Sequence, residues 1–204
     1  MGKLRLAVLA SGRGSNLQAI IDAIAAGELD AEIAVVISDK GDAQALERAR
    51  KHQIPHRFLD PREYSAAGAY DRALVALWQE YQVDLVVLAG YMRLLGSEAV
   101  RAYRNRILNI HPSLLPAFPG LNAQAQALAY GVRYSGCTVH FVDEGMDTGP
   151  IILQAVVPVK DDDAAETLAA RILEEEHRLY PQAIQLFAEG RLEVVGRRVR
   201  IREK

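Results

Sequence analysis

Cysteine is scarce in this sequence. Cys137 is the one thiol among 204 residues, so no intramolecular disulfide can form. Proteins of oxidising compartments commonly carry disulfides, and we therefore expect a reducing, cytoplasmic location. Cys137 lies in an apolar stretch with no obvious base beside it, which is typical of a buried structural thiol.

The sequence also lacks a surplus of charge and a long hydrophobic run. Its 24 Lys and Arg residues and 26 Asp and Glu residues leave a formal net charge of −2. Binding to nucleic acid or to a membrane surface normally needs a basic surplus, so neither partner is expected. No stretch approaches the roughly 20 apolar residues of a membrane span. The apolar start, "MGKLRLAVLA", runs directly into "SGRGSN" and predicts a first strand, not a signal peptide.

Metal-ligand clusters are missing as well. His52 and His56 are four residues apart, but Pro55 prevents them from sharing a regular helical face. No third ligand stands near them in the sequence, so no metal site is expected.

What the sequence does contain is an alternation of short apolar runs with helical patterns. Half of its residues are hydrophobic, which suits one globular domain over residues 1–204. The run at 83–90 is apolar on both faces, and such strands belong in parallel sheets that helices cover on both sides. The pattern predicts strands at 5–10, 31–38, 54–59, 83–90 and 107–111, and helices at 16–27, 42–52, 69–81 and 121–130.

The second half of the sequence has a different pattern. Two strand-like runs, 134–142 and 150–159, flank the turn-rich "DEGMDTG" and predict an antiparallel pair. A helical pattern follows over 163–189, where Pro181 predicts a kink or break near Tyr180. Two short terminal runs predict a hairpin. The expected fold is therefore α/β, a Rossmann-like and mostly parallel sheet flanked by helices, with an antiparallel addition in the C-terminal half.

A glycine-containing loop, "SGRGSN", stands between the first strand and the first helix. Gly14 allows close backbone approach, Ser15 or Asn16 can cap the helix, and a helix N-terminus attracts anions, so the loop is a candidate phosphate site. Leu17 replaces the third glycine of a dinucleotide fingerprint, and Asp39 is the acid available for a ribose. The alternative is a tight turn before a capped helix.

The stretch "ILNIHPSLLP" carries the stronger chemical signal. Asn109 and His111 share one face at the end of an apolar strand, and Pro112 turns the chain away directly after them. Open α/β sheets place ligands at this carboxyl edge. An amide can donate to an oxyanion and an imidazole can move a proton, so the pair indicates a catalytic site, with a hydrogen-bonded strand end as the alternative.

Asp147 is the natural third member of this site. It lies in "DEGMDTGP", a loop shaped by glycine and proline, and a carboxylate beside His111 would favour the protonated imidazole and could hold a water. Asp143 and Glu144 are competing acids, and the sequence does not choose among the three. Elsewhere, Met92, Leu94 and Leu95 follow a strand end and could form an apolar ring pocket or simply core. Glu176 lies on the apolar stripe of the late helix as a boundary residue or a ligand contact.

Several motifs together resemble the folate-dependent phosphoribosylglycinamide formyltransferase family. They appear in order across nearly the whole chain as "SGRGSNLQAI", "LAGYMRLL", "ILNIHPSLLPAFPG", "TVHFVDEGMDTGPIILQ" and "EEEHRLYP". The Asn-x-His-Pro-Ser-Leu-Leu-Pro block with its downstream Asp is specific to folate formyltransferases and related hydrolases, and the N-terminal loop favours the ribonucleotide branch.

The resemblance implies transfer of a formyl group from 10-formyltetrahydrofolate, as co-substrate, to the amine of 5-phosphoribosylglycinamide in purine biosynthesis. It implies small-molecule partners, no metal, and a monomer or homodimer. It also implies that Asn109, His111 and Asp147 are the catalytic residues. Ribonucleotide binding falls to Gly14, Ser15, Asn16 and Glu176. Folate binding falls to Met92, Arg93, Leu94, Leu95, Asn109, Asp143, Glu144, Gly145, Met146 and Asp147.

The chain departs from the family pattern at two positions. Ala67 stands where some members carry a basic residue that approaches the folate, and Arg62 is a candidate substitute. Leu173 occupies a position where some relatives have Gln. Each departure would weaken one ligand contact, and neither touches the catalytic trio.

Three other functions compete with this interpretation. A formyltetrahydrofolate hydrolase or another formyltransferase would keep the chemistry and change the acceptor, but those enzymes add a regulatory or β-barrel domain for which this chain is too short. A dinucleotide-binding protein is disfavoured by the incomplete glycine fingerprint. A non-catalytic binding module is disfavoured by the intact Asn109, His111 and Asp147.

Overall fold

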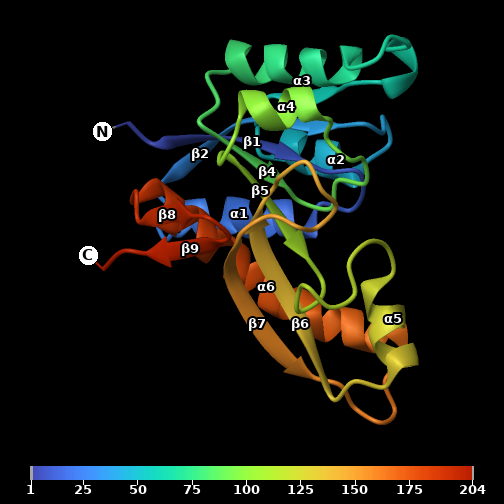
Figure 1. Cartoon of the computed structure of the whole chain (residues 1–204). Coiled ribbons are helices and arrows are strands. Elements are labelled where there is room, and N and C mark those ends of the chain that lie inside the picture. Colours follow the sequence, from blue (N-terminus) through green and yellow to red (C-terminus); the bar gives the residue numbers. More distant parts are fainter. Residues whose placement is uncertain (1, 204) are drawn as a thin grey trace. The chain divides into compact units, whose positions relative to one another are not determined.

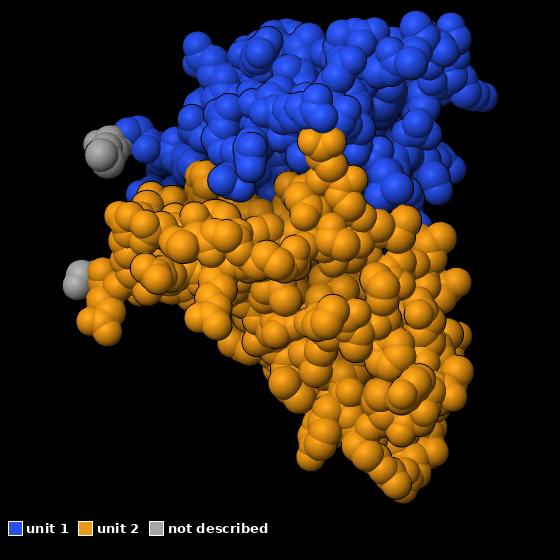
Figure 2. Space-filling model, in the orientation of Figure 1, with its two compact units in different colours: residues 1–108 blue, residues 109–204 orange. Residues whose placement is uncertain are grey.

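The computed structural model describes residues 2–203, which divide into two compact units, one ending at residue 108 and the other beginning at residue 109 (Figure 2). The boundary falls inside strand β5 (Ile107–His111), so the candidate catalytic residues of that strand belong to the second unit. No helix among residues 2–203 is long and apolar enough to cross a membrane.

The first unit contains a parallel sheet with helices on both sides. Strand β1 pairs with β2 and β4, and β2 pairs with β3, all in parallel. In Figure 1, α3 and α4 lie together on one side of these strands and α1 lies on the other. The elements are β1 (Leu4–Leu9), α1 (Ser15–Ala25), β2 (Ala31–Ser38), α2 (Gln44–Lys51), β3 (His56–Phe58), the short 3-10 helix η1 (Pro61–Glu63), α3 (Ala69–Glu80), β4 (Leu85–Leu88) and α4 (Ser97–Ala102).

Burial explains why these apolar runs become parallel strands. Consecutive residues of β1 and β4, such as Leu6 to Leu9 and Leu85 to Val87, are fully buried on both faces. A strand buried on both faces needs cover on each side, which helices in the βαβ connections provide. The carboxyl ends of β1, β2 and β4 therefore point their following loops toward one edge of the sheet.

The second unit is built around an antiparallel pair. Strand β6 (Tyr134–Phe141) pairs with β7 (Ile151–Pro158) in antiparallel register, and the 143–149 loop joins them. Helix α6 (Ala165–Ala188) packs on both strands and on α5 (Ala123–Tyr130) (Figure 1). A terminal hairpin, β8 (Leu192–Val195) and β9 (Arg198–Ile201), adds to β7 through a parallel contact between Ile151 and Arg198.

The structure confirms the predicted α/β class, the antiparallel pair and the terminal hairpin. The break predicted near Tyr180 is wrong, because α6 is continuous over 24 residues with Pro181 inside it. Tyr180, Ala183 and Ile184 are fully buried around this proline. Their packing outweighs the missing backbone hydrogen bond, which local sequence alone cannot anticipate. Helices η1 and α4 were not predicted.

A first testable prediction concerns Gly136 in β6. A Cβ atom there would lie 1.8 Å from the carbonyl oxygen of Ala155 and 2.9 Å from Leu114 Cδ2. Overpacking costs roughly 1–3 kcal/mol, and each kcal/mol lowers the melting temperature of a chain this size by about 2–4 °C. We therefore expect Gly136→Ala to melt several degrees below the wild type in calorimetry. Gly2→Ala, where a Cβ meets nothing within 4 Å, is the matched control, and equal melting of the two variants would contradict the predicted clash.

Candidate active site

Three predicted catalytic side chains lie in the second unit. Asn109 and His111 project from β5, and His111 is 5 % exposed. Asp147 comes from the 143–149 loop, and its Oδ2 atom lies 3.5 Å from His111 Nδ1. A histidine and a carboxylate 36 positions apart in the sequence thus face one another in a largely buried place.

Backbone groups form hydrogen bonds with both members of the His111–Asp147 pair. His111 Nε2 lies 2.8 Å from the Phe118 carbonyl oxygen, which can only accept, so Nε2 carries a hydrogen. The Gly120 N–H donates to Asp147 Oδ2 at 2.8 Å, so this carboxylate oxygen has a backbone partner. The remaining nitrogen, Nδ1, faces that carboxylate. A hydrogen on Nδ1 would make this contact an ion pair.

His140 is a member of this cluster that the sequence interpretation missed. Its Nδ1 lies 2.9 Å from the Phe141 carbonyl, so Nδ1 carries the hydrogen. Its Nε2 then accepts from Asn109 Nδ2 at 3.3 Å, and lies 3.9 Å from Asp147 Oδ1. The signal that could have revealed it is the alternation of Thr138 and His140 on one face of the predicted strand, in the motif "TVHFV".

Burial decides the charge state of His140. The side chain is 2 % exposed, and desolvation lowers its pKa despite the nearby Asp147 carboxylate. A neutral ring fits the hydrogen bonds, since only a neutral Nε2 can accept from Asn109. His140 therefore orients the Asn109 amide, which keeps its second N–H for another acceptor.

Asp143 and Asp147 have different environments within the 143–149 loop. Asp143 Oδ1 accepts hydrogen bonds from the Gly145 N–H at 3.0 Å and the Thr148 hydroxyl at 2.6 Å, so this carboxylate shapes the loop. Asp147 has a φ of 53°, in the left-handed region that Asp tolerates better than most residues. The loop geometry thus places Asp147 beside His111, whereas the Asp143 carboxylate forms hydrogen bonds within its own loop.

Thr138 on β6 fixes the turn that follows β5. Its hydroxyl donates to the Ser113 carbonyl at 2.7 Å and accepts from the Leu115 N–H at 3.1 Å and from Gln154 Nε2 at 3.0 Å. Ser113 in turn donates to the Ala117 carbonyl at 2.6 Å. This network holds the segment that carries the Phe118 carbonyl and the Gly120 N–H.

In the first unit, the candidate phosphate loop has a different cap from the one predicted. Helix α1 begins at Ser15, and its N-cap is Gly14 with a φ of 71°, so neither Ser15 nor Asn16 is the capping residue. A Cβ on Gly14 would lie 2.9 Å from Ala45. Glycine is needed here because α2 packs directly behind the loop, where Arg48 Nε also donates to the Arg13 carbonyl at 2.7 Å.

Ser11 links three loops of the first unit. Its hydroxyl donates to Asp39 Oδ1 at 2.6 Å and accepts from the Met92 N–H at 2.9 Å. Asp39, which the sequence offered as a ribose ligand, is thus engaged with Ser11. The connection fixes the start of the 92–95 segment, whose Met92 and Leu94 are 59 % and 69 % exposed. Exposed apolar side chains in a fixed segment are suited to cover a ligand ring.

The two departures from the family pattern have clear local environments. Arg62 forms a fork with Asp60, with Nη2 2.6 Å from Oδ2, and the Arg62 side chain is 86 % exposed. The Ala67 carbonyl accepts from Arg72, which also pairs with Glu98. The Arg93 guanidinium lies 4.9 Å from the centre of the ring of Tyr70, three residues after Ala67. Arg62 is therefore committed to Asp60 in this structure.

Glu176 and Leu173 lie on α6 in the second unit. Glu176 is 7 % exposed, and Leu173 is half-buried. Burial raises the pKa of the Cys137 thiol to about 12, with a further contribution from the Glu176 charge. Cys137 is itself fully buried, and this pKa fits the structural thiol expected from the sequence.

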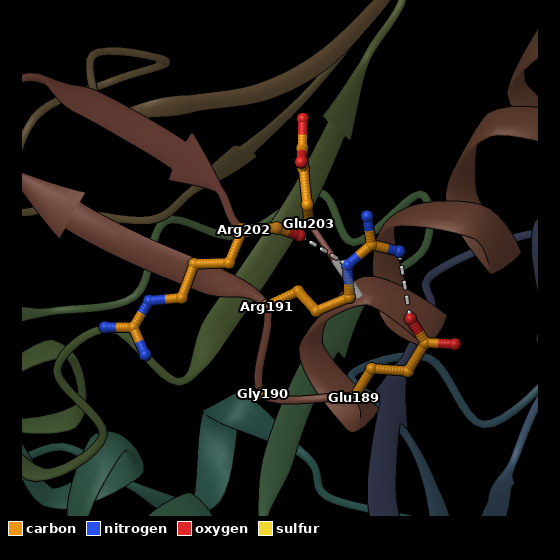
Figure 3. Close-up of a pocket in the computed structure, with 5 residues that line it drawn as sticks. All are labelled: Glu189, Gly190, Arg191, Arg202 and Glu203. Carbon is orange, nitrogen blue, oxygen red and sulfur yellow. Dashed lines mark hydrogen bonds and ion pairs between the residues drawn. The ribbon is translucent and has the colours of Figure 1, made fainter.

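An open depression of about 460 Å³ lies at the end of α6, and Figure 3 shows the residues that line it. It is lined by Glu189, Gly190, Arg191, Arg202 and Glu203, none of which is a predicted site residue. Two acidic and two basic side chains balance one another there, so the depression has no charge preference for a ligand. Across residues 2–203, no group of three His, Cys, Asp or Glu side chains is placed to hold a metal ion.

Comparison with known proteins places this geometry in a family. The family model for formyl transferases matches residues 4–184. The chain is 58 % identical to glycinamide ribonucleotide transformylase 1 from Symbiobacterium toebii, whose crystal structure matches with a TM-score of 0.97 over 98 % of this chain and 95 % of that one. A formyltetrahydrofolate deformylase from Pseudomonas syringae pv. tomato is 30 % identical, with a TM-score of 0.90 over 98 % of this chain and 66 % of that one.

Curated relatives differ in length. The chain spans only 19 % of the trifunctional purine biosynthetic protein adenosine-3 of Gallus gallus, with 45 % identity over 94 % of this chain. It spans 93 % of the phosphoribosylglycinamide formyltransferase of Bacillus subtilis, with 45 % identity over 89 % of this chain. The chain therefore belongs to the formyl transferase family, in its phosphoribosylglycinamide formyltransferase branch.

Proposed function

We propose that this protein transfers the formyl group of 10-formyltetrahydrofolate to the amine of 5-phosphoribosylglycinamide, giving N-formylglycinamide ribonucleotide and tetrahydrofolate. The observation that carries the proposal is the His111–Asp147 pair beside an Asn109 amide that His140 orients. A positioned amide donor and a proton-holding pair are what acyl transfer to an amine requires. The substrate amine is the nucleophile, so no Ser or Cys is needed.

The proposed reaction has two bond changes. The amine nitrogen forms a bond to the formyl carbon, and the carbonyl oxygen becomes an oxyanion. Asn109 stabilises that oxyanion through its second N–H, with the positive charge of protonated His111 contributing. The carbon–nitrogen bond to the folate then breaks. A proton leaves the attacking amine and one reaches the folate nitrogen, both through the His111–Asp147 pair or a water that it holds.

Ligand binding is assigned by similarity to the family motifs. We propose that the ribonucleotide contacts Gly14, Ser15, Asn16 and Glu176. We propose that the folate contacts the 92–95 and 143–147 segments together with Asn109. The formyl transferase match over residues 4–184 covers most of both compact units, which supports a single formyltransferase domain over 1–204. We further propose that the protein works in the cytoplasm on small molecules alone, as a monomer or homodimer.

The decisive test of this function uses both substrates. Incubation with 10-formyltetrahydrofolate and phosphoribosylglycinamide should release tetrahydrofolate, and omission of the ribonucleotide should stop the release. Folate absorbance follows the release, and mass spectrometry identifies the formylated ribonucleotide. Equal release without the ribonucleotide would indicate a deformylase, and no release in either reaction would contradict both functions.

Asp147→Asn tests the proton-holding pair. The amide keeps the size of the side chain but cannot hold the shared proton, so kcat should fall by roughly 10²-fold or more. Ribonucleotide affinity, measured by calorimetry, should change little. Asp161→Asn is a matched control, because Asp161 is an exposed carboxylate paired with Arg133. A comparable loss in affinity and kcat for Asp147→Asn would contradict the role assigned to it.

The neutral state of His140 predicts a pH dependence of stability. Its pKa is lowered in the folded protein, whereas a histidine in an unfolded chain has a pKa of about 6.5. Below that pH the unfolded state binds a proton that the folded state excludes, so the free energy of unfolding should fall as pH drops from 7 to 5. His140→Gln keeps an acceptor for Asn109 without titrating and should show a shallower fall in urea unfolding. A variant with the wild-type slope would refute this assignment, and exposed His52→Gln controls for loss of a histidine.

A further inference from the structure

We propose that the terminal hairpin β8–β9 is a positioning element for the 143–149 loop and that Arg197 is its contact residue. The inference rests on the proposed function, because it assigns a source for the placement of Asp147. The hairpin lies beyond residues 4–184, the part of the chain that the family match covers.

The contact is a hydrogen bond at the tip of the hairpin. Arg197 Nη2 donates to the Thr148 carbonyl at 2.8 Å, one residue after Asp147. Val195 pairs with Arg198, so Gly196 and Arg197 are the two residues of the turn. Gly196 has a φ of 61°, which a two-residue hairpin turn needs at its first position. The tight turn thus gives Arg197 a defined starting direction.

The base of the hairpin is anchored to Glu189, the residue that caps the C-terminal end of α6. Arg191 donates hydrogen bonds to Glu189 at 3.0 Å and to the Arg202 carbonyl at 2.7 Å. Figure 3 marks both contacts. The Arg202 N–H returns a hydrogen bond to the Arg191 carbonyl at 2.9 Å. Beside the loop, Arg198 pairs with Ile151 of β7. The base and one edge of the hairpin are therefore held, so its tip can restrain the neighbouring 143–149 loop.

The 143–149 loop is a segment that needs such a restraint. Glu144, Gly145 and Met146 are exposed, so little apolar burial holds the loop in place. Asp147 adopts its positive φ of 53° directly before the restrained Thr148 carbonyl. Its carboxylate must reach both His111 Nδ1 and the Gly120 N–H. A small shift of the backbone at Asp147 and Thr148 would lengthen both contacts.

Other features of the two units have local structural roles. The depression at Glu189 to Glu203 has balanced charges and serves as the hairpin anchor. Asp163 accepts two hydrogen bonds from Arg171 and one from Thr167, a network that closes the start of α6. Tyr134 and Val156 are exposed apolar side chains on the β6–β7 pair, and no described residue covers them.

The test compares three full-length variants. Arg197→Met removes the donor and keeps much of the side-chain length, Arg197→Lys keeps a donor, and Arg200→Met removes an exposed arginine of the same hairpin that lies opposite Glu193. Each variant is measured for melting temperature, for kcat and KM of both substrates, and for hydrogen exchange of the Gly120 amide by NMR. That amide reports the Asp147 carboxylate directly, without any substrate.

We expect Arg197→Met to lower kcat about threefold to tenfold, the range that loss of one exposed hydrogen bond supports. The KM for the ribonucleotide should stay within about twofold, because a positioning defect acts on the transition state. The Gly120 amide should exchange several times faster. Arg197→Lys should recover most of both effects, and Arg200→Met should match the wild type with a melting temperature close to it.

Two results would overturn the proposal. One is unchanged Gly120 exchange or unchanged kcat in Arg197→Met, and the other is an equal loss in Arg200→Met, which would indicate a general effect of hairpin charge. Failure of the proposed function is separable, because it would appear as no formyl transfer by the wild type. The exchange measurement would then still decide whether Arg197 positions Asp147.

Discussion

The second unit depends on the partly desolvated contact between His111 and Asp147. A buried imidazole and carboxylate 3.5 Å apart are stable when their other polar atoms have hydrogen-bond partners. The Phe118 carbonyl and the Gly120 N–H meet that requirement, and both lie in the turn after β5. The backbone of that turn and of the 143–149 loop must therefore be held in position, and the neighbouring residues supply the contacts that hold it.

Strand β6 supplies much of this support through two residues of one face. Thr138 holds the turn after β5 through two hydrogen bonds and accepts a third from Gln154 of β7, and His140 holds the Asn109 amide. Their requirements differ. Thr138 needs only its hydroxyl, whereas His140 must be neutral and in one tautomer. Burial within the antiparallel pair lowers the pKa of His140 and keeps the ring neutral. The packing of this unit therefore also sets the charge state of a residue at its candidate site.

The first unit applies a different solution to its candidate ligand loops. Ser11, between β1 and α1, connects the loop after β2 to the loop after β4 with a single hydroxyl. Helix α2 packs so closely behind the phosphate loop that Gly14 has no room for a side chain. Loops at the carboxyl edge of a parallel sheet are otherwise the least ordered parts of such folds, and these contacts limit their freedom.

Much of this protein could be predicted from its sequence. Periodicity identified the α/β class, the antiparallel pair and the terminal hairpin, because alternation and turn residues are local signals. The shared face of Asn109 and His111 followed from strand geometry alone. Local signals failed where burial competes with propensity. Pro181 predicts a break, but the buried residues around it keep α6 continuous.

The sequence by itself determined the class of fold and the residue types of the candidate site, since both are written in short-range patterns and motifs. Strand and turn patterns left Asp143, Glu144 and Asp147 open, and only the family resemblance named Asp147. Tertiary structure places Asp147 against His111 and bonds Asp143 within its own loop. It also decided the role of His140 and the contact of Arg197, since hydrogen-bond partners distant in sequence leave no periodic signal. The charge of a buried histidine depends on what surrounds it, and only the folded chain supplies those surroundings.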